Sequence, residues 1–334
     1  MNPVRAAISA VNGYVPDYIL TNAELEHMVD TNDEWIRSRT GIKERRILKG
    51  DMQTSDMGVK IVEGLLAKSN TKPEEIELLI CGTITGDRKL PDTANTICDK
   101  AGLVNSYGFD INAACSGFLF SLTVGAKFIE SGTHKKVIVI GADVMSSIID
   151  YTDRATCVIF GDGAGGVLLE PSTDGTGIQG SILRGDGSGR EFLHIKAGGS
   201  SQAITPEILA KREHLVYQEG KAVFKNAIRG MVATTTELLA KYDLLPSQMD
   251  WVVPHQANLR IITAVADELK IPMENVMTNI ERYGNTTAAT LPLCLWDYES
   301  KLHKGDKIVL TAFGGGFTWG STYIVWSYDG DDKS

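Results

Sequence analysis

The feature that most constrains the fold is a regular alternation of short apolar runs with longer segments in which apolar residues recur at helical spacing. The runs are rich in β-branched residues, which is typical of strands. They lie at residues 78–80, 137–140, 158–160, 251–253, 308–311 and 323–326. Strands that alternate with helices predict an α/β fold.

The two halves of the chain also look alike. IELLICGT (76–83) and MDWVVPHQ (249–256) are both apolar runs with an acidic flank, and each follows a proline closely. In both halves the run leads into a loop and then into a helical segment of similar length. We therefore predict one βαβ plan used twice, in a first half of residues 1–173 and a second half of residues 174–334.

The repeat relates individual residues as well. Cys115 precedes the run at 137–140 by 22 residues (137 − 115), and Asn285 precedes the run at 308–311 by 23 (308 − 285). We expect these two residues to occupy equivalent places. Because ligands of α/β sheets gather at the carboxyl ends of strands, Cys115, His255 and Asn285 are predicted to converge.

Composition and charge narrow the class of protein. The 334 residues are 43% hydrophobic and 22% charged, which is typical of a soluble, folded protein. The formal net charge of −9 argues against nucleic acid as a partner, since duplex binding needs a basic face.

Neither a membrane span nor a targeting segment is predicted. No apolar run reaches the roughly 18 residues of a span, and the N-terminal sequence MNPVRAAISA does not resemble a signal peptide. We therefore expect a cytoplasmic protein. The most apolar stretch, residues 118–129, contains Lys127 and is predicted to be a buried helix.

Cys115 is the candidate nucleophile. It lies in INAACSGFLF, where small residues lead directly into the apolar stretch, so its sulfur is predicted to lie at a helix N-terminus. Free backbone N–H groups and the helix dipole favour the reactive thiolate there. The remaining cysteines are expected to be buried and inert, and their scattered positions predict neither a disulfide framework nor a zinc site: Cys81, Cys98, Cys157 and Cys294.

Two more polar residues are candidates for the same site. His255, in VVPHQANLRI, follows an apolar run, so its side chain is expected to face a cleft at the end of a buried strand. Asn285, in RYGNTTAAT, can donate through its amide, although Asn after Gly is also a frequent turn residue. The other histidines have no such context and are not candidates: His27, His134, His194, His214 and His303.

Two glycine-rich segments carry different predictions. In FGGGFTWG (313–320), three consecutive glycines let backbone N–H groups approach a ligand, which favours an oxyanion hole, and the aromatic flanks predict a packed loop. FGDGAGGVLL (160–169) lacks the lysine and the spacing of a phosphate loop, so it predicts tight packing of a strand and a turn.

The motifs NAACSGF, PHQANLRI, GNTTAA and AFGGGFTWG occur in this order and resemble the β-ketoacyl-acyl carrier protein synthase III family. TNDEWIRSRTGIKERR (31–46) and DRATCVIFGDGAGG (153–166) extend the resemblance over nearly the whole chain. The resemblance implies a thiolase-like duplicated α/β/α/β/α layered fold and a homodimer. It also implies a decarboxylative Claisen condensation of an acyl-CoA primer with malonyl-acyl carrier protein, which starts fatty-acid synthesis without a cofactor or a metal.

The resemblance implies a role for each matching residue. Cys115 is the acyl-accepting nucleophile, while His255 and Asn285 form the decarboxylation and condensation site. The N–H groups of Cys115 and Gly315 would hold the tetrahedral oxyanion. Substrate-binding positions, among which Trp35 and Arg154 would sandwich the adenine of CoA, are Thr31, Trp35, Arg39, Leu90, Arg154, Gly220, Asn258 and Phe313.

Two positions depart from the family pattern. Asp267 and Glu268 stand where familiar members carry a basic pair that docks the acidic carrier protein, so docking would fall to Arg260, Lys221 and Lys225. At the end of the acyl pocket, Leu90 stands where acetyl-preferring members often have Phe, which favours a longer or branched primer.

Other functions share these residue types. Condensing enzymes of polyketide or secondary-metabolite synthesis have the same Cys, His and Asn and stay open as the alternative. A reversible thiolase is disfavoured because GNTTAA offers no second cysteine. A cysteine protease fits the strand-end positions and the glycine loop less well, and a non-catalytic binding module is disfavoured because all three polar groups are intact.

Overall fold

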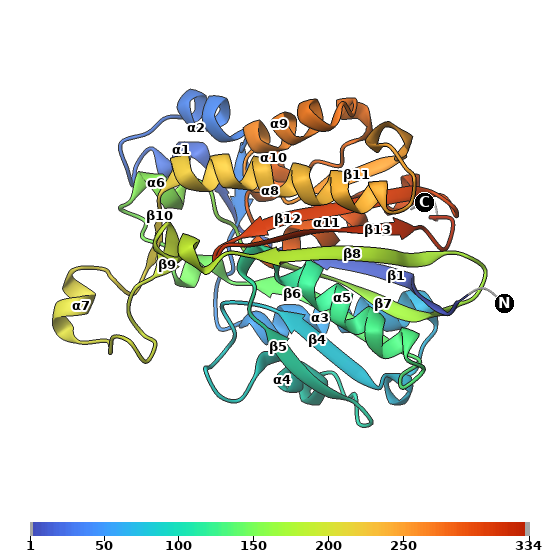
Figure 1. Cartoon of the computed structure of the whole chain (residues 1–334). Coiled ribbons are helices and arrows are strands. Elements are labelled where there is room, and N and C mark those ends of the chain that lie inside the picture. Colours follow the sequence, from blue (N-terminus) through green and yellow to red (C-terminus); the bar gives the residue numbers. More distant parts are fainter. Residues whose placement is uncertain (1–2, 331–334) are drawn as a thin grey trace.

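Two sheets with helices on their faces make up the computed structural model, which describes residues 3–330 (Figure 1). The first sheet has the order β1 (Arg5–Tyr14), β7 (Gly163–Ser172), β6 (Val137–Asp143), β4 (Leu78–Gly82), β5 (Tyr107–Ile111). The second has the order β11 (Trp251–Pro254), β12 (Lys307–Gly314), β13 (Thr318–Val325), β8 (Gly177–Gly185). Two small hairpins pair β2 (Ile19–Thr21) with β3 (Glu44–Arg46) and β9 (Leu193–Ile195) with β10 (Val216–Gln218).

The helices form three layers around these sheets (Figure 1). α3 (Thr54–Ser69) and α4 (Thr93–Lys100) cover the first sheet, and α8 (Gly220–Ala240) and α9 (Leu259–Leu269) cover the second. Between the sheets lie α5 (Gly117–Glu130) and α11 (Thr290–Tyr298). The remaining helices are short: α1 (Asn22–Leu25), α2 (Asp33–Thr40), α6 (Arg154–Cys157), α7 (Pro206–Ala210) and α10 (Ile280–Tyr283).

The duplication predicted from sequence is present in the sheet topology. β4 and β6 pair in parallel, as do β11 and β12, and each pair continues through antiparallel strands, to β7 and β1 in one sheet and to β13 and β8 in the other. The boundary that we place between residues 173 and 174 falls between the end of β7 and the start of β8. It remains our proposal for dividing the chain.

The predicted equivalence of Cys115 and Asn285 is wrong by three residues. A left-handed residue opens a short 3-10 turn in each half: Ala114 (φ 47°) before α5, and Thr287 (φ 52°) before α11. Counting from these residues, Cys115 corresponds to Ala288, and Asn285 corresponds to Asn112. Spacing between apolar runs missed this offset because the helix that follows is shorter in the second half, 9 residues in α11 against 14 in α5.

One of the predicted strands is also wrong. Residues 158–160 follow α6 as a turn, because Asp153 caps that helix, and the strand begins only at Gly163. The glycines of FGDGAGGVLL do pack tightly, since a Cβ on Gly165 would lie 3.0 Å from the backbone N of Leu293 in α11. Sequence reasoning missed β1, β5 and β8, whose alanines and glycines weaken the apolar pattern.

The central helices are the most buried elements. The stretch predicted as a buried helix is α5, in which Phe118, Leu119 and Leu122 are fully buried, and Leu291 and Leu295 of α11 are buried beside it. Each such side chain contributes about 1.5–3 kcal/mol relative to an exposed one. Burial of α5 and α11 therefore holds the 3-10 turns at their N-termini in place.

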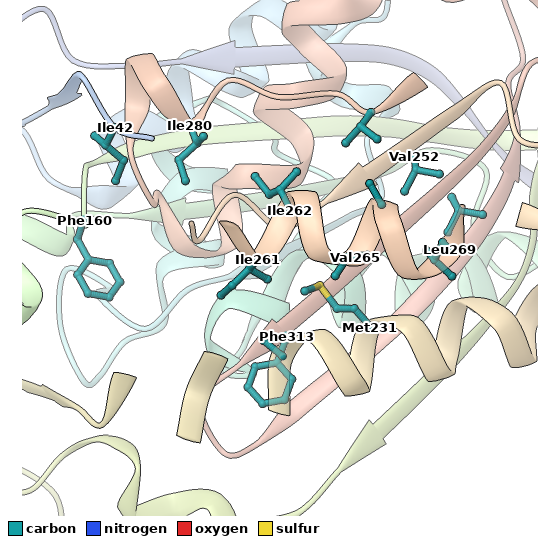
Figure 2. Packing of buried hydrophobic residues seen from close by; sticks show 14 of the residues in the cluster. Ile42, Phe160, Met231, Val252, Ile261, Ile262, Val265, Leu269, Ile280 and Phe313 are labelled. Carbon is teal, nitrogen blue, oxygen red and sulfur yellow. The ribbon is translucent and has the colours of Figure 1, made fainter. Parts of the chain in front are cut away.

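On the outer face, α9 packs through one apolar stripe (Figure 2). Ile262, Val265 and Leu269 lie on this stripe and face Val252 of β11 and Met231 of α8. Their spacing of three or four residues is what puts them on one side of the helix. The packing fixes the start of α9 and thereby the loop 255–258 that precedes it.

One segment departs from the layered body. Residues 196–215, which include α7, stand away from it between β9 and β10 (Figure 1). None of the helices in residues 3–330 combines the length and the apolar character that a membrane span requires.

Candidate active site

Two adjoining cavities meet at Cys115. The larger has a volume of about 370 Å³ and the smaller about 170 Å³, and Cys115, Phe160 and Leu193 line both. His255 and Asn285 line the smaller cavity. The structure thus brings the sulfur of the first half and the imidazole and amide of the second half to one place.

Cys115 lies in the 3-10 turn 114–116, directly before α5. Its side chain is almost entirely buried, and this burial raises the pKa of the thiol to about 12, with the negative charge of Asp143 as the second cause. Hydrogen bonding from the Asn285 side chain acts in the opposite direction. Burial therefore opposes the effect of the helix N-terminus on this thiol, and the reactive thiolate stays a prediction.

His255 directly follows strand β11 and is held on both sides. Its backbone N donates to the carbonyl of Thr311 in β12 at 2.8 Å, and its Nδ1 lies 2.7 Å from Oγ1 of Thr290. Burial lowers the pKa of the imidazole to about 3. The ring is neutral throughout the physiological pH range, and its Nε2 is left for a ligand.

Asn285 is fixed through its backbone and its side chain. Its N–H donates to Ile159 at 2.9 Å, and its carbonyl accepts from Gly161 at 3.1 Å. Oδ1 accepts the N–H of Thr287 at 2.8 Å. Because the oxygen is occupied in this way, the NH₂ group is the part that is free to donate into the cavity.

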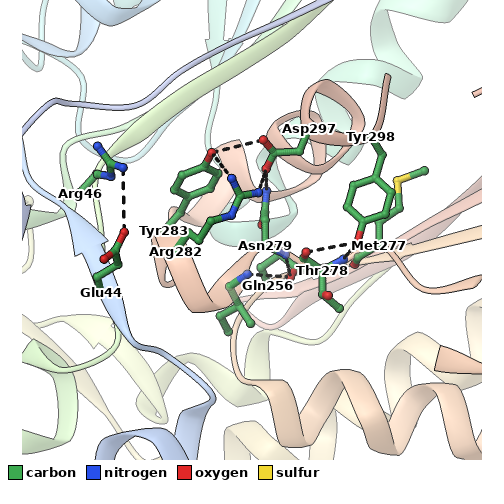
Figure 3. A network of polar contacts seen from close by, with 11 residues as sticks. Glu44, Arg46, Gln256, Met277, Thr278, Asn279, Arg282, Tyr283, Asp297 and Tyr298 are labelled. Carbon is green, nitrogen blue, oxygen red and sulfur yellow. Dashed lines mark hydrogen bonds and ion pairs between the residues drawn. The ribbon is translucent and has the colours of Figure 1, made fainter. Parts of the chain in front are cut away.

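A buried polar network joins the loop of His255 to the segment that leads to Asn285 (Figure 3). Oε1 of Gln256 accepts from the backbone N–H groups of Asn279 (3.1 Å) and Ile280 (3.3 Å). Asp297 of α11 in turn binds the Asn279 amide at 2.9 Å and the Arg282 guanidinium at 2.8 Å. Gln256 itself is fully buried. The network therefore fixes the separation of His255 and Asn285.

The triple-glycine segment closes the site from the β12–β13 hairpin. A Cβ on Gly314 would lie 2.8 Å from the backbone N of Cys115, so only glycine lets the two backbones come this close. Gly315 lines the larger cavity and Phe313 the smaller one. The predicted packed loop is present, since the rings of Phe313 and Phe317 lie 4.8 Å apart.

Trp35 and Arg154 contact each other at the surface. The guanidinium carbon of Arg154 lies 4.8 Å from the centre of the Trp35 ring, and Nη1 of Arg154 donates to the carbonyl of Asp30 at 2.8 Å. A base that binds between the two side chains has to separate them. Nearby, Thr31 has a buried hydroxyl without a partner among residues 3–330.

Of the remaining predicted ligand positions, two line the smaller cavity and two lie outside both cavities. Gly220 and Asn258 line the smaller cavity, while Asn258 also caps α9 by accepting from Arg260 N at 2.9 Å and donates to the Arg39 carbonyl at 3.0 Å. Arg39 is exposed. Leu90 lines neither cavity and is 85% exposed, so the structure does not bring it to the acyl pocket of its own chain.

Several residues at the site were not found from sequence. His194, which the sequence set aside, lines the larger cavity together with Asn112 and Thr287. Asn112 has a signal in the sequence once the repeat is aligned correctly, because it is the counterpart of Asn285. Thr290 has none, since its importance comes from a contact with His255 across 35 residues.

All five cysteines are buried and unpaired. Within residues 3–330, no group of three His, Cys, Asp or Glu side chains is arranged to hold a metal ion.

A duplicated α/β fold with a cysteine, a histidine and an asparagine at one cavity defines a condensing enzyme of the thiolase-like fold. Comparison with known proteins identifies the group within this class. The family model described as 3-oxoacyl-[acyl-carrier-protein (ACP)] synthase III matches residues 109–187, and its C-terminal counterpart matches residues 239–326. The chain belongs to the 3-oxoacyl-[acyl-carrier-protein] synthase III family, as its motifs predicted.

Three relatives illustrate the similarity. "Beta-ketoacyl-[acyl-carrier-protein] synthase III 1" of Bacteroides thetaiotaomicron is 53% identical over 330 residues, which cover 98% of each chain. The crystal structure of 3-oxoacyl-[acyl-carrier-protein] synthase III from Aquifex aeolicus VF5 is 40% identical, with a TM-score of 0.89, and the match covers 96% of this chain and 100% of that one. The priming β-ketosynthase of the R1128 polyketide biosynthetic pathway is 30% identical, with a TM-score of 0.91 and 98% of each chain covered.

Proposed function

We propose that the chain is a β-ketoacyl-acyl carrier protein synthase III that condenses an acyl-CoA primer with malonyl-acyl carrier protein. The observation that carries the proposal is the single cavity lined by Cys115, His255 and Asn285. The 53% identity to a named synthase III over nearly the whole chain agrees with it. Acyl-CoA and malonyl-acyl carrier protein are substrates in this reaction, and we propose no cofactor or metal.

In the first half-reaction, Cys115 takes the acyl group. The sulfur attacks the thioester carbonyl of acyl-CoA, the carbon–sulfur bond to CoA breaks, and the thiol proton of Cys115 ends on the CoA sulfur. The tetrahedral oxyanion would be stabilised by the N–H groups of Cys115 and Gly315. The close approach of Gly314 to the backbone N of Cys115 supports this pairing.

In the second half-reaction, the malonyl group loses its carboxylate as carbon dioxide. The enolate oxygen left behind needs two donors, for which we propose Nε2–H of His255 and the NH₂ group of Asn285. The enolate carbon then attacks the acyl-Cys115 thioester, the carbon–sulfur bond to Cys115 breaks, and the sulfur leaves as a thiolate that takes up a proton from solvent. A neutral imidazole suits this role, and burial keeps His255 neutral.

We propose that the Thr290 hydroxyl donates to Nδ1 of His255 rather than to the carbonyl of Thr287, since both acceptors lie within its reach. It lies 2.7 Å from Nδ1 of His255 and 3.0 Å from the carbonyl of Thr287, and it has one proton to donate. When it donates to Nδ1, the imidazole proton sits on Nε2, which is the tautomer that the second half-reaction requires.

Binding of CoA and of the carrier protein is proposed at the cavity mouth. Trp35 and Arg154 would hold the adenine, with Thr31 and Arg39 beside them, while Gly220, Asn258 and Phe313 line the way to Cys115. Carrier-protein docking is assigned to Lys221, Lys225 and Arg260. Among the ion pairs of residues 3–330, none involves these three side chains, so their charge is available to an acidic partner.

We propose a cytoplasmic homodimer. Strand β5 is the last strand of its sheet, and Tyr107 at its start is 47% exposed, with Val104 (75%) close by in sequence. An unpaired edge flanked by exposed apolar side chains favours pairing with a second copy. Leu90 would line an acyl pocket only if such a dimer placed it at the pocket of the second copy.

Mass spectrometry of the intact protein tests the proposal. After incubation with a panel of acyl-CoAs, the wild type gains the mass of one acyl group, and the best-accepted chain names the primer. Cys115→Ala loses the adduct, whereas Cys98→Ala keeps it, although the two cysteines are equally buried (6% and 5% exposed). Equal labelling of wild type and Cys115→Ala would refute the nucleophile.

The alternative is a priming enzyme of polyketide or secondary-metabolite synthesis. The similarity to the R1128 priming β-ketosynthase supports this alternative. The chain is 30% identical to that protein, however, and 53% identical to the synthase III of Bacteroides thetaiotaomicron. Comparing condensation rates with malonyl groups on a fatty-acid carrier protein and on a polyketide carrier protein separates the two.

A further inference from the structure

Asp143 is a fully buried carboxylate that the proposed reaction does not use. It is the last residue of β6, in the first half of the chain, and it lies between two segments that line the larger cavity. One is the loop after β4, with Ile84, and the other is the turn after Asn285, with Thr287.

The first oxygen of Asp143 holds the loop after β4. Oδ1 accepts from the backbone N of Ile84 at 2.8 Å and from the hydroxyls of Thr83 (3.0 Å) and Thr85 (2.7 Å). Each of these hydroxyls in turn accepts a backbone N–H, from Thr85 and Val144 respectively. Their protons are therefore directed at the carboxylate, which is satisfied as an anion.

The second carboxylate oxygen of Asp143 contacts the second half of the chain. Oδ2 accepts a short hydrogen bond from Oγ1 of Thr287 and lies 3.5 Å from the backbone N of Ala288. Thr287 is the same residue whose N–H is bound by Oδ1 of Asn285. Thr287 thus joins Asp143 of the first half, through its hydroxyl, to Asn285 of the second, through its backbone N–H.

The backbone conformation of Thr287 explains why the 3-10 turn before α11 needs a stabilising contact. Its φ of 52° is left-handed, a conformation that β-branched residues rarely adopt and that persists only where the surroundings impose it. The bond from Thr287 Oγ1 to Asp143 is such a constraint. Without it, Thr287 N–H would no longer be fixed against Asn285.

We propose that Asp143 is a positioning residue that acts through Thr287 to aim the Asn285 amide at the enolate oxygen. The inference rests on the proposed function. It predicts that the Asp143–Thr287 contact matters for the decarboxylation step and much less for acylation of Cys115, because Asn285 donates to the substrate only in the second step.

The experiment compares two neighbouring threonines. Thr287→Val removes the hydroxyl bound to Asp143, whereas Thr286→Val removes a buried hydroxyl that has no partner among residues 3–330. Both variants keep a β-branched side chain. For each, acylation is followed by intact mass and decarboxylation by release of labelled carbon dioxide from malonyl-carrier protein, with a thermal melt as a measure of folding.

We expect Thr287→Val to acylate within about 2-fold of the wild type but to release carbon dioxide on the order of 10-fold or more slowly, since a misaimed donor stabilises the enolate less. Thr287→Ser should restore the rate, and Thr286→Val should match the wild type in both steps. Asp143→Asn should slow carbon dioxide release in the same way, although loss of its charge also lowers the pKa of Cys115 and so changes acylation. In carbon dioxide release, the double variant Asp143→Asn/Thr287→Val should be no slower than the slower single variant.

Equal slowing of both steps, normal decarboxylation in Thr287→Val, or additive losses in the double variant would overturn the inference. Failure of Thr287→Val to fold would also overturn it, since the contact would then serve the fold. A wild type that neither acylates nor decarboxylates would instead refute the proposed function.

Discussion

The hydroxyl oxygen of Thr290 lies 2.7 Å from Nδ1 of His255, and both residues are buried. Thr290 is the first residue of α11, so the helix that separates the two sheets also places the partner of the catalytic imidazole. The ring of His255 therefore depends on a single hydroxyl for its orientation at Nδ1.

Thr290→Val tests this dependence. Valine keeps the shape of threonine but cannot bond Nδ1, so the proton is no longer held on Nε2. We expect decarboxylation to fall by on the order of 10-fold or more, up to the loss of about 100- to 1,000-fold that follows removal of an oxyanion donor. Thr290→Ser keeps the hydroxyl and should retain most of the rate. Equal rates in Thr290→Val and the wild type, measured by release of labelled carbon dioxide, would contradict the assigned tautomer.

His255→Ala and Asn285→Ala separate the two half-reactions. Neither residue is required for acyl transfer to Cys115 in the proposed mechanism, so both variants should still form the acyl adduct. Each should lose malonyl decarboxylation by about 100-fold or more, because each removes one donor to the enolate oxygen. Retained carbon dioxide release in both variants would show that other groups stabilise the enolate.

The outcome of the sequence predictions has a physical pattern. The segments carrying Cys115, His255 and Asn285 were predictable, since each lies at a strand or helix end with a distinctive local motif. The strand predicted at 158–160 failed because local β-propensity was overridden by the cap of Asp153 on α6. The apolar residues of this run do not by themselves indicate that a capped helix precedes them.

Contacts between distant residues were not predictable. Thr287 and Asp143 are 144 residues apart, and neither stands in an unusual sequence context. The burial that raises the pKa of the Cys115 thiol was not predictable for a related reason, because the helix N-terminus is visible in sequence but complete burial of the sulfur is not. Burial depends on the packing of both halves.

The neutral His255 predicts a pH dependence of stability. Burial lowers the pKa of its imidazole from 6.5 to about 3. Between these values the unfolded chain binds a proton that the folded chain does not, so this contribution to the free energy of unfolding is fully present above about pH 6.5 and is lost as the pH falls toward 3. At pH 5 the loss is about 2 kcal/mol, from about 1.5 pH units at 1.36 kcal/mol each.

Denaturant unfolding at about pH 7.5 and pH 5 measures this loss when the wild type is compared with His255→Gln. Glutamine does not titrate, so the wild type should lose about 2 kcal/mol more than the variant over this range. An equal loss in both proteins would mean that the imidazole titrates normally in the folded state.

The contact between Trp35 and Arg154 predicts a discrimination between substrates. If the adenine of CoA binds between these side chains, Trp35→Ala should lower kcat/KM for acyl-CoA by about 10-fold, the size expected for one lost base–aromatic stack. An acyl-pantetheine, which has no adenine, should react equally well with both proteins. The same loss with acyl-pantetheine would place Trp35 outside nucleotide binding.

The cationic rim at the start of α8 and α9 is the last surface to be tested. The guanidinium carbon of Arg260 lies 5.5 Å from the centre of the Phe224 ring, so this side chain is held beside the exposed Lys225. Lys225→Glu and Arg260→Glu should each raise KM for malonyl-carrier protein about 10-fold and leave KM for malonyl-CoA unchanged, because only the protein substrate presents an acidic surface. Lys241→Glu is the matched control, since it makes the same charge reversal on the exposed C-cap residue of α8, 16 positions beyond Lys225 (241 − 225), a distance of about 24 Å. An equal rise in KM for Lys241→Glu would indicate a general effect of net charge, and no change in any variant would move carrier-protein docking away from this rim.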